Sequence, residues 1–472
     1  MKPNIVLIYL DDLGYGDVSA YQSGTLQTPN MDRLANEGLR FTDGYASSAT
    51  CTPSRYAIMT GTYPWRNPRA SILRGDSAMI IDTEETTLPG VLGRQGYHTA
   101  LVGKWHLGLG SGSLDWNEEI SPGPNQVGFD YSYIMAATQD RVPTVYIENG
   151  RVVNLDPNDP IEVDYRNNFE GEPTALTHPE LVTMPGARSH SDSIVNGIPR
   201  IGFMRGGASA RWSDIDMADH FLEKGIDYIQ ERSQSERPFF LFFSMQQPHV
   251  PRTPNPRFVG ETGMGPRGDV IAEADWVVGE LYKTLEKEGL LENTLIVLTS
   301  DNGPVLNDGY QDDARAKLGD HTPSGGFRGQ KYHLFEAGTR VPFVTYWKGT
   351  IQPGVSSALV TQIDLLASLA ALTGSDASAP DSENLLDAFL GKSQQGRDSF
   401  VSEARRKTAL RAGDWVMIPP YPGDNRAWYE VHQLFNLKDD PGQENNLAES
   451  HPEKLQEMVR QYTALRKGAS EK

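Results

Sequence analysis

The sequence predicts an α/β protein with a large, mostly parallel mixed sheet between layers of helices, followed by a smaller C-terminal α+β subdomain. Continuous apolar runs such as residues 4–10 are typical of strands that are buried on both faces. These runs alternate with segments of helical periodicity, which favours parallel strands joined by crossover helices. From about residue 376 the alternation gives way to short segments that resemble antiparallel strands.

Each element of the main domain can be placed from its own signals. A helix is expected from Thr28-Pro29 to Gly38, because proline suits the first helical turn and glycine commonly follows the last one. Residues 216–232 carry apolar side chains at the spacing of an amphipathic helix. The other strands are expected at 97–102, 239–245, 295–300 and 343–347, and the other helices at 88–95, 269–288 and 361–372.

Two regions depart from this alternation. Residues 108–215 are rich in Gly, Pro, Asn and Asp, and we interpret them as an insertion on the substrate side that contains a hairpin at 146–153 around Asn149-Gly150. We therefore expect a main domain over 1–375 and a C-terminal subdomain over 376–472. The strands expected in this subdomain are 399–404, 408–411, 414–418 and 431–436, followed by a helix at 452–466.

Composition narrows the possible partners. The net charge of −19 argues against nucleic acid and against an anionic membrane surface. No run of about 18 apolar residues is present, so no membrane-spanning helix is expected. The sequence enters its first strand directly and shows no signal peptide, which leaves a cytoplasmic protein or one whose leader is absent from this sequence.

Cys51 is the only cysteine, so it cannot form an intramolecular disulfide. A single thiol also argues against a zinc or iron–sulfur site, because such sites commonly use several cysteine ligands. It lies at an expected helix start, Pro53-Ser54-Arg55, and Arg55 is four residues away, on the same side of the first turn. A sulfur atom at the positive end of a helix beside a guanidinium suits anionic chemistry. The alternative is a small buried apolar residue, although its neighbours are not typical of a core.

Acidic residues directly follow two of the expected strands. Asp11-Asp12 comes after residues 4–10, and Asp301-Asn302 comes after residues 295–300. Because ligands bind outside the carboxyl ends of strands in open α/β sheets, both pairs should lie at one edge. Their hard oxygen atoms favour Ca²⁺ or Mg²⁺ over zinc, whereas each pair alone could be a helix or loop cap.

Basic residues and histidines follow other strands. Lys104 and His106 come after residues 97–102 and are two positions apart, so an extended chain would place them on one face. His249 follows the strand at 239–245, and Lys331 lies in a loop ahead of residues 343–347. Each of these residues alone could be an ordinary loop residue.

Taken together, these segments resemble the type I sulfatases of the alkaline-phosphatase superfamily. The signature is Cys51-x-Pro53-Ser54-Arg55 followed by Thr60-Gly61-x-x-Pro64, with Met59 where leucine is usual. Residues 103–108 match the family's Gly-Lys-Trp-His-Leu-Gly motif, and Lys331 lies in a segment similar to its Gly-x-Lys motif, although Ala337 replaces a glycine further on. The matches stand in the family's order along the chain.

The resemblance implies a chemistry and a set of site residues. Residue 51 is expected to be oxidised to Cα-formylglycine by a formylglycine-generating enzyme, and the protein is expected to be periplasmic or secreted. The expected metal is Ca²⁺ rather than Mg²⁺, held by Asp11, Asp12, Asp301, Asn302 and modified Cys51. The expected catalytic residues are Cys51, Arg55, Lys104, His106, His249 and Lys331.

The expected substrate is a sulfated carbohydrate, with galactose or N-acetylgalactosamine 6- or 4-sulfate as the first choice. The candidate sugar contacts are His178, His190, Arg211, Trp212, Arg252 and His321. Two alternatives stay open: a phosphonate monoester or phosphodiester hydrolase of the same superfamily, and a non-catalytic glycan-binding protein if Cys51 is unmodified. The sequence gives no oligomeric state.

Overall fold

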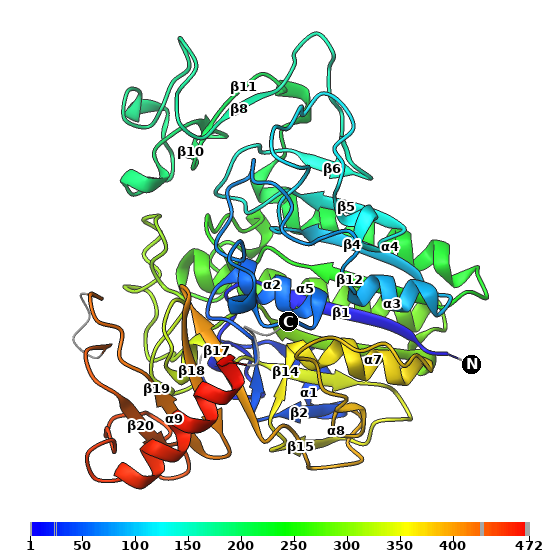
Figure 1. Ribbon diagram of the computed structural model, residues 1–472. Coiled ribbons are helices and arrows are strands. Elements are labelled where there is room, and N and C mark those ends of the chain that lie inside the picture. Colours follow the sequence, from blue (N-terminus) through cyan, green and yellow to red (C-terminus); the bar gives the residue numbers. More distant parts are fainter. Residues whose placement is uncertain (1, 23, 25, 425–428, 468–472) are drawn as a thin grey trace.

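A computed structural model describes residues 2–22, 24, 26–424 and 429–467. A ten-stranded sheet crosses the main domain in the order β15-β2-β14-β13-β1-β12-β4-β5-β6-β7 (Figure 1). The strands, in sheet order, are β15 (Gly354–Ser356), β2 (Leu39–Phe41), β14 (Phe343–Tyr346), β13 (Thr294–Ser300), β1 (Asn4–Leu10), β12 (Phe239–Ser244), β4 (His98–Lys104), β5 (Tyr131–Met135), β6 (Tyr146–Glu148) and β7 (Arg151–Val152).

The centre of this sheet is parallel. Strands β13, β1, β12, β4 and β5 run in the same direction, so their carboxyl ends meet at one edge. β14 pairs antiparallel with β13 on one side, and β6 pairs antiparallel with β5 on the other. The predicted mixed, mostly parallel sheet is confirmed.

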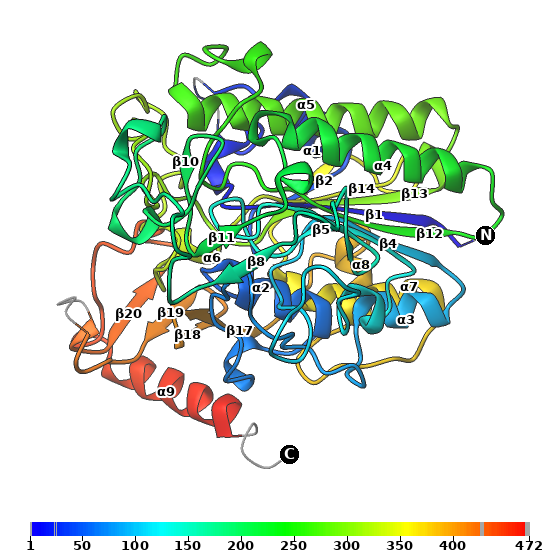
Figure 2. The same ribbon diagram turned by 90° about the horizontal axis from the view of Figure 1, so that it is seen from above.

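Helices cover both faces of the sheet (Figure 2). Alternate residues of β1 enter two different cores: Ile5 and Leu7 pack in one, and Val6 and Ile8 pack in the other. This alternation explains why β1 is apolar throughout, since neither face meets water. One face carries α1 (Pro29–Glu37), α4 (Met217–Ser233) and α5 (Gly265–Lys287), and the other carries α2 (Cys51–Thr60), α3 (Leu88–Arg94), α7 (Leu365–Thr373) and α8 (Leu386–Phe389).

The expected helices and strands are present, with ends that differ by a few residues. The hairpin is also confirmed: Asn149 and Gly150 have φ values of 46° and 82°, as a two-residue turn between twisted strands requires. The segment 108–215 nevertheless contributes β5, β6 and β7 to the central sheet, and β5 was not anticipated. The rest of the segment forms two small ladders, β8 (Glu162–Asp164) with β11 (Phe203–Arg205) and β9 (Ile194–Val195) with β10 (Ile198–Pro199).

The C-terminal part forms an antiparallel sheet with one helix packed on it. Its strands are β17 (Ser399–Ala404), β18 (Lys407–Ala412), β19 (Trp415–Ile418) and β20 (Gln433–Asn436), and α9 (Pro452–Lys467) follows. Apolar side chains of this sheet share a core with Tyr45 and Tyr63 of the main domain. Figure 2 places this sheet at the end of the molecule where the parallel strands terminate, so it lies beside the loops that leave those strands.

A few short elements complete the fold, namely β3 (Gly44–Tyr45), β16 (Val360–Thr361) and α6 (Glu336–Thr339). None of the helices in the described parts of the chain has the length and apolar character that a bilayer crossing requires.

Candidate active site

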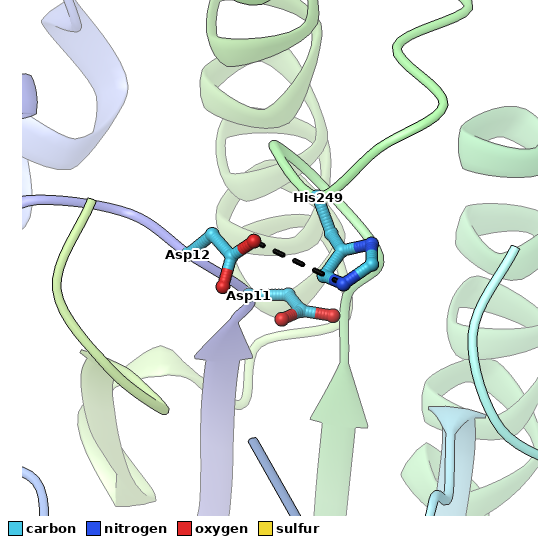
Figure 3. A group of neighbouring side chains, drawn as sticks. All are labelled: Asp11, Asp12 and His249. Atoms are coloured by element: carbon cyan, nitrogen blue, oxygen red, sulfur yellow. Dashed lines mark ion pairs between the residues drawn. The ribbon is translucent and has the colours of Figure 1, made fainter. Parts of the chain in front are cut away.

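Charged side chains converge where the central parallel strands end. Asp11 follows β1, Asp301 follows β13 and Lys104 is the last residue of β4. His249 lies in the loop after β12, and Figure 3 shows its imidazole beside the carboxylates of Asp11 and Asp12. All five of these side chains are buried.

Short polar contacts join the acidic residues. The backbone N–H of Asp12 donates to Oδ1 of Asp301 at 3.2 Å, and Nδ2 of Asn302 donates to Oδ1 of Asp12 at 2.7 Å. One ligand atom each of Asp11, Asp12 and His249 lies within 4.8 Å of the others. The two acidic pairs predicted from the sequence therefore meet at one edge of the sheet.

Two atoms of this cluster indicate a cation. Oδ1 of Asp11 and Oδ1 of Asn302 are buried and have no hydrogen-bond partner among the described residues. Burial and the charge of Asp301 raise the pKa of Asp11 well above its usual value. Buried acceptors without donors are costly, and hard oxygen atoms suit Ca²⁺ or Mg²⁺. A divalent cation thus fits the oxygen atoms of Asp11, Asp12, Asp301 and Asn302. The imidazole of His249 suits softer metals than Ca²⁺ or Mg²⁺.

Three buried cations surround the acidic cluster. Arg55 donates from Nε and Nη2 to Oδ2 of Asp301 at 3.1 and 2.9 Å. Lys104 donates to Oδ2 of Asp11, and Lys331 donates to Oδ2 of Asp12 at 2.9 Å. Burial alone lowers the pKa of Lys331, but nearby carboxylates raise it well above its usual value, so its ammonium stays charged.

Cys51 is the first residue of α2 and is buried against these groups. Burial raises the pKa of its thiol, although the charges of Lys104 and Lys331 act in the opposite direction. The unmodified thiol is therefore protonated at neutral pH and a weak nucleophile. The N-terminus of α2, Lys104 and Lys331 place positive charge near this side chain, and the carboxylates of Asp301 and Asp11 oppose it.

The hydrogen bonds of the two histidines define which ring nitrogen faces the site. Nδ1 of His249 lies 2.6 Å from the carbonyl oxygen of Val250, so it carries the proton and leaves Nε2 toward Asp12, 3.9 Å away. Nε2 of His106 lies 2.9 Å from the carbonyl oxygen of Leu73, which leaves Nδ1 buried without a partner in the described chain. Each histidine thus presents one nitrogen that can exchange a proton.

The geometry of His106 differs from the sequence-based expectation. Lys104 and His106 were expected to share a face of an extended segment. β4 instead ends at Lys104, and His106 has a φ of 56°, so the chain turns sharply between them. The carbonyl oxygen of His106 accepts a hydrogen bond from Thr52 at 3.0 Å, which ties this turn to the start of α2.

Four further residues complete the site, and no sequence motif points to them. Asp308 accepts from Lys331 at 2.9 Å and from the hydroxyl of Tyr332 at 2.9 Å. Tyr332 has a φ of 75°, which is rare for an aromatic residue and typical of functional positions. Asp140 pairs with Arg141 at 2.8 Å, and the pKa of Asp140 is held well below its usual value despite burial, by Arg141 and a hydrogen bond from His190. All four lie in loops without periodicity, where spacing gives no signal.

The six candidate sugar contacts lie in different environments. His190 lies 3.2 Å from Asp140, and His178 is exposed. Arg211 is half-buried, and Trp212 is buried, with its indole N–H on Asp214 at 3.1 Å. His321 is buried against Asp17 at 2.8 Å.

Arg252 is fully enclosed by protein acceptors. Its guanidinium donates to Asp312 at 2.8 Å and to the carbonyl oxygens of Pro248, Val305 and Leu306. These contacts leave it little capacity to bind a sugar. Arg252 instead ties the loop that carries His249 to the loop that follows Asn302.

Replacing Arg252 with methionine is expected to destabilise the protein by about 3–5 kcal/mol, because Asp312 is left buried without its partner. The free energy of unfolding, measured by guanidinium chloride denaturation, tests this. Arg315→Met is the control, since Arg315 is exposed in the same loop. A loss below about 1 kcal/mol would show that the ion pair is not structural.

Comparison with known proteins gives a consistent result. A family profile described as Sulfatase matches residues 3–375. The N-acetylgalactosamine-6-O-sulfatase of Bacteroides thetaiotaomicron is 46% identical over 470 residues, which cover 97% of this chain and 92% of the relative. Human arylsulfatase A is 31% identical over 496 residues, with 97% and 86% covered.

Solved structures agree with these sequence matches. A structure from work on the metabolism of multiple glycosaminoglycans by Bacteroides thetaiotaomicron superposes with a TM-score of 0.96 at 45% identity and covers 99% of both chains. The PsFucS1 sulfatase from Pseudoalteromonas sp. superposes with a TM-score of 0.71 at 26% identity, covering 98% of this chain and 90% of the other.

Proposed function

This chain belongs to the sulfatase family and is a hydrolase of sulfuric esters on carbohydrates, and from that premise we propose that it removes a 6-O-sulfate from N-acetylgalactosamine or galactose. The sugar and the position are supported by the relative named N-acetylgalactosamine-6-O-sulfatase, which aligns over almost the whole chain. The chemistry is supported by one observation above all. Cys51, the oxygen cluster and the buried cations meet at the carboxyl ends of the central strands.

The charges of the site suit a sulfate monoester. Counted in their charged forms, four carboxylates face three cations, which leaves one excess negative charge. A divalent cation reverses this to one positive charge, which matches the single negative charge of a sulfate monoester. This local balance explains how a protein of net charge −19 can bind an anionic substrate. The carboxylates are Asp11, Asp12, Asp301 and Asp308, and the cations are Arg55, Lys104 and Lys331.

Two groups supply the core chemistry. Asp11, Asp12, Asp301 and Asn302 would hold Ca²⁺, which would supply stabilisation of negative charge on the sulfuryl group and a lower pKa for a nearby hydroxyl. A formylglycine at position 51 supplies a hydrated aldehyde, in which one hydroxyl is the nucleophile and the other allows sulfate to be expelled.

The other residues position charge and move protons. Lys104 and Lys331 neutralise negative charge on the sulfuryl group, and Arg55 orients the side chain at position 51. Nε2 of His249 gives its proton to the departing sugar oxygen, and Nδ1 of His106 accepts a proton when sulfate is released. Burial and Lys331 lower the pKa of His249 well below its usual value in the free protein. A bound sulfate ester adds negative charge beside the imidazole and favours its protonated form.

Replacing His249 with alanine is expected to lower kcat on a sulfated sugar by about 10²–10⁴-fold, because the sugar alkoxide then leaves without a proton. The loss should be smaller on nitrophenyl sulfate, since nitrophenolate is a stable leaving group. Steady-state kinetics on both substrates give the comparison. Equal losses on the two substrates would contradict the assignment of His249 as the proton donor.

The substrate is tested by sulfate release from defined 6- and 4-sulfated N-acetylgalactosamine and galactose. We expect turnover of the 6-sulfates, and turnover of the 4-sulfates alone would overturn the proposed position. A comparison of nitrophenyl sulfate with phenyl phosphonate separates this activity from that of a phosphonate monoester hydrolase. The mass of the peptide that contains residue 51 tests the glycan-binding alternative.

Three further assignments belong to this proposal. Residues 1–375 act as the catalytic domain, with part of 108–215 on the substrate side, and residues 376–472 act as the C-terminal subdomain, although its first stretch, which includes α8, packs in the core of the main sheet. A formylglycine-generating enzyme acts on Cys51. The protein works in the periplasm or outside the cell.

A further inference from the structure

A strained turn of the C-terminal subdomain lies beside the reaction centre. Arg405 and Arg406 connect β17 to β18, and both have left-handed φ values, 49° and 66°. Residues other than glycine adopt this conformation rarely, and it persists where surrounding contacts impose it. Both arginine side chains are exposed.

Glu403 anchors this turn to the segment that precedes Cys51. The residue is only 2% exposed, and its carboxylate accepts hydrogen bonds from Oγ of Ser48 and from the backbone N–H of Arg406. The backbone of Glu403 also pairs with the segment, accepting from Ala49 at 2.7 Å and donating to Ser47 at 3.2 Å. The position of the turn relative to residue 51 is thus fixed by buried contacts.

Arg405 reaches from this turn toward Lys331. Its guanidinium lies 4.3 Å from the centre of the Tyr332 ring. The Tyr332 hydroxyl donates to Asp308, which also accepts from Lys331. Two residues, Tyr332 and Asp308, therefore connect Arg405 to a lysine that faces the sulfuryl group in the proposed mechanism.

A pocket of about 300 Å³ opens beside the turn. Its lining includes Thr50 and Pro53 from the start of α2, Ser71 and Ile72, and Arg405. The pocket therefore adjoins the helix turn that carries the nucleophile. A sugar attached to the one being desulfated could occupy it.

The guanidinium of Arg405 has its hydrogen-bonding edge available. Its neighbour Lys407 pairs with Asp424 at 2.9 Å, whereas no carboxylate in the described parts of the chain comes within 4.0 Å of Arg405. A guanidinium stacked on an aromatic ring keeps its planar donor edge free for a carboxylate or a sulfate.

We propose that Arg405 binds an anionic substituent, a carboxylate or a second sulfate, on the sugar next to the one that is desulfated. The inference rests on the proposed function and extends it: the preferred substrate is an anionic oligosaccharide rather than a monosaccharide. Tyr332 orients the guanidinium, and Glu403 fixes the turn that presents it. Arg406, whose guanidinium donates to the carbonyl oxygen of Pro68 at 2.6 Å, adds positive charge nearby.

The test compares substrates that differ in a single charge. Sulfate release is measured from a disaccharide of 6-sulfated N-acetylgalactosamine and a uronic acid, and from the same disaccharide with its carboxyl group reduced to an alcohol. A third disaccharide carries a second sulfate on the neighbouring sugar in place of the carboxylate. The readout is the ratio of kcat/KM for each charged disaccharide to that for the carboxyl-reduced one, which is independent of the fraction of active enzyme.

In Arg405→Gln this ratio is expected to fall about tenfold for at least one charged disaccharide, and the disaccharide affected identifies the anion as a carboxylate or a sulfate. Arg405→Lys should restore part of the preference, since it keeps the charge without the planar donor edge. Arg460→Gln, at an exposed arginine on α9, is the control and should leave the ratio unchanged.

Several results would overturn the inference. One is a wild-type enzyme that does not prefer either charged disaccharide. Another is an Arg405→Gln variant that keeps the wild-type ratios or loses activity equally on all three substrates. Sulfate release from 6-sulfated N-acetylgalactosamine but from none of the disaccharides would likewise overturn the inference and leave the proposed function standing. Release from none of these substrates, the monosaccharide included, would overturn the proposed function itself, and this would be known before any variant is compared.

Discussion

Replacing Cys51 with alanine is expected to lower kcat/KM for sulfate release by at least about 10⁴-fold, because the variant cannot form the nucleophile. Residue 51 is buried at the start of α2, where the charges of Lys104 and Lys331 act on it. The thiol itself is a poor alternative nucleophile, since burial raises its pKa. Kinetics on nitrophenyl sulfate and on a sulfated sugar measure the effect.

Two observations separate loss of chemistry from loss of fold. Met59→Leu changes a buried core residue of the same helix at nearly constant volume and should retain turnover. Cys51→Ala should melt close to the wild-type temperature. In mature wild-type protein, conversion of the thiol to an aldehyde lowers the mass of the peptide by about 18 daltons. Turnover retained by the alanine variant would refute the formylglycine mechanism.

Much of the fold and the centre of the site could be predicted because they depend on local signals. The apolar run of β1 reflects burial on both faces, and Asp11 follows it directly. Parallel strands bring their carboxyl ends together, so residues that follow β1 and β13 meet. Asp12 and Asp301, which share a hydrogen bond, are 289 positions apart in the sequence. Motif spacing was therefore enough to place the oxygen cluster and its cations.

The surroundings of the centre depend on long-range contacts, which spacing does not encode. Arg252 and His321 are of the side-chain types expected in sugar contacts. In the structure, however, Arg252 pairs with Asp312 and His321 pairs with Asp17, and both pairs are buried. The contact of Arg405 with Tyr332 joins a hairpin turn to a residue that lies more than 70 positions earlier in the sequence. β5 also escaped prediction, because its short run of tyrosines and serine is flanked by irregular loops.

The proposed metal would have a structural role as well as a chemical one. Without it, Asp11 and Asp301 lie together in a buried site, and Oδ1 of Asp11 lacks a donor among the residues described. Like charges at close range oppose each other strongly where water is excluded. A divalent cation that binds only the folded protein removes this repulsion, so its binding free energy adds to the stability.

Removal of Ca²⁺ with a chelator is therefore expected to lower both the rate of sulfate release and the melting temperature, and added Ca²⁺ should restore both. At a free concentration about 100-fold above the dissociation constant, the stabilisation is about 3 kcal/mol. Calorimetry across a series of Ca²⁺ concentrations measures it independently of activity. Mg²⁺ should restore less, because it demands a stricter octahedral geometry than this mixed set of carboxylate and amide oxygens offers.

A pair of variants tests which carboxylates hold the ion. Asp12→Asn should largely remove the dependence of the melting temperature on Ca²⁺, because it neutralises one of the assigned ligands. Asp308→Asn should keep that dependence, since Asp308 contacts Lys331 and Tyr332 and is not an assigned ligand, although it belongs to the same charged cluster. A wild-type melting temperature indifferent to Ca²⁺, or equal behaviour of the two variants, would contradict the assigned metal site. Each substitution removes one negative charge from the same buried cluster. A difference between the two variants therefore reports the loss of a metal ligand and not the change in net charge.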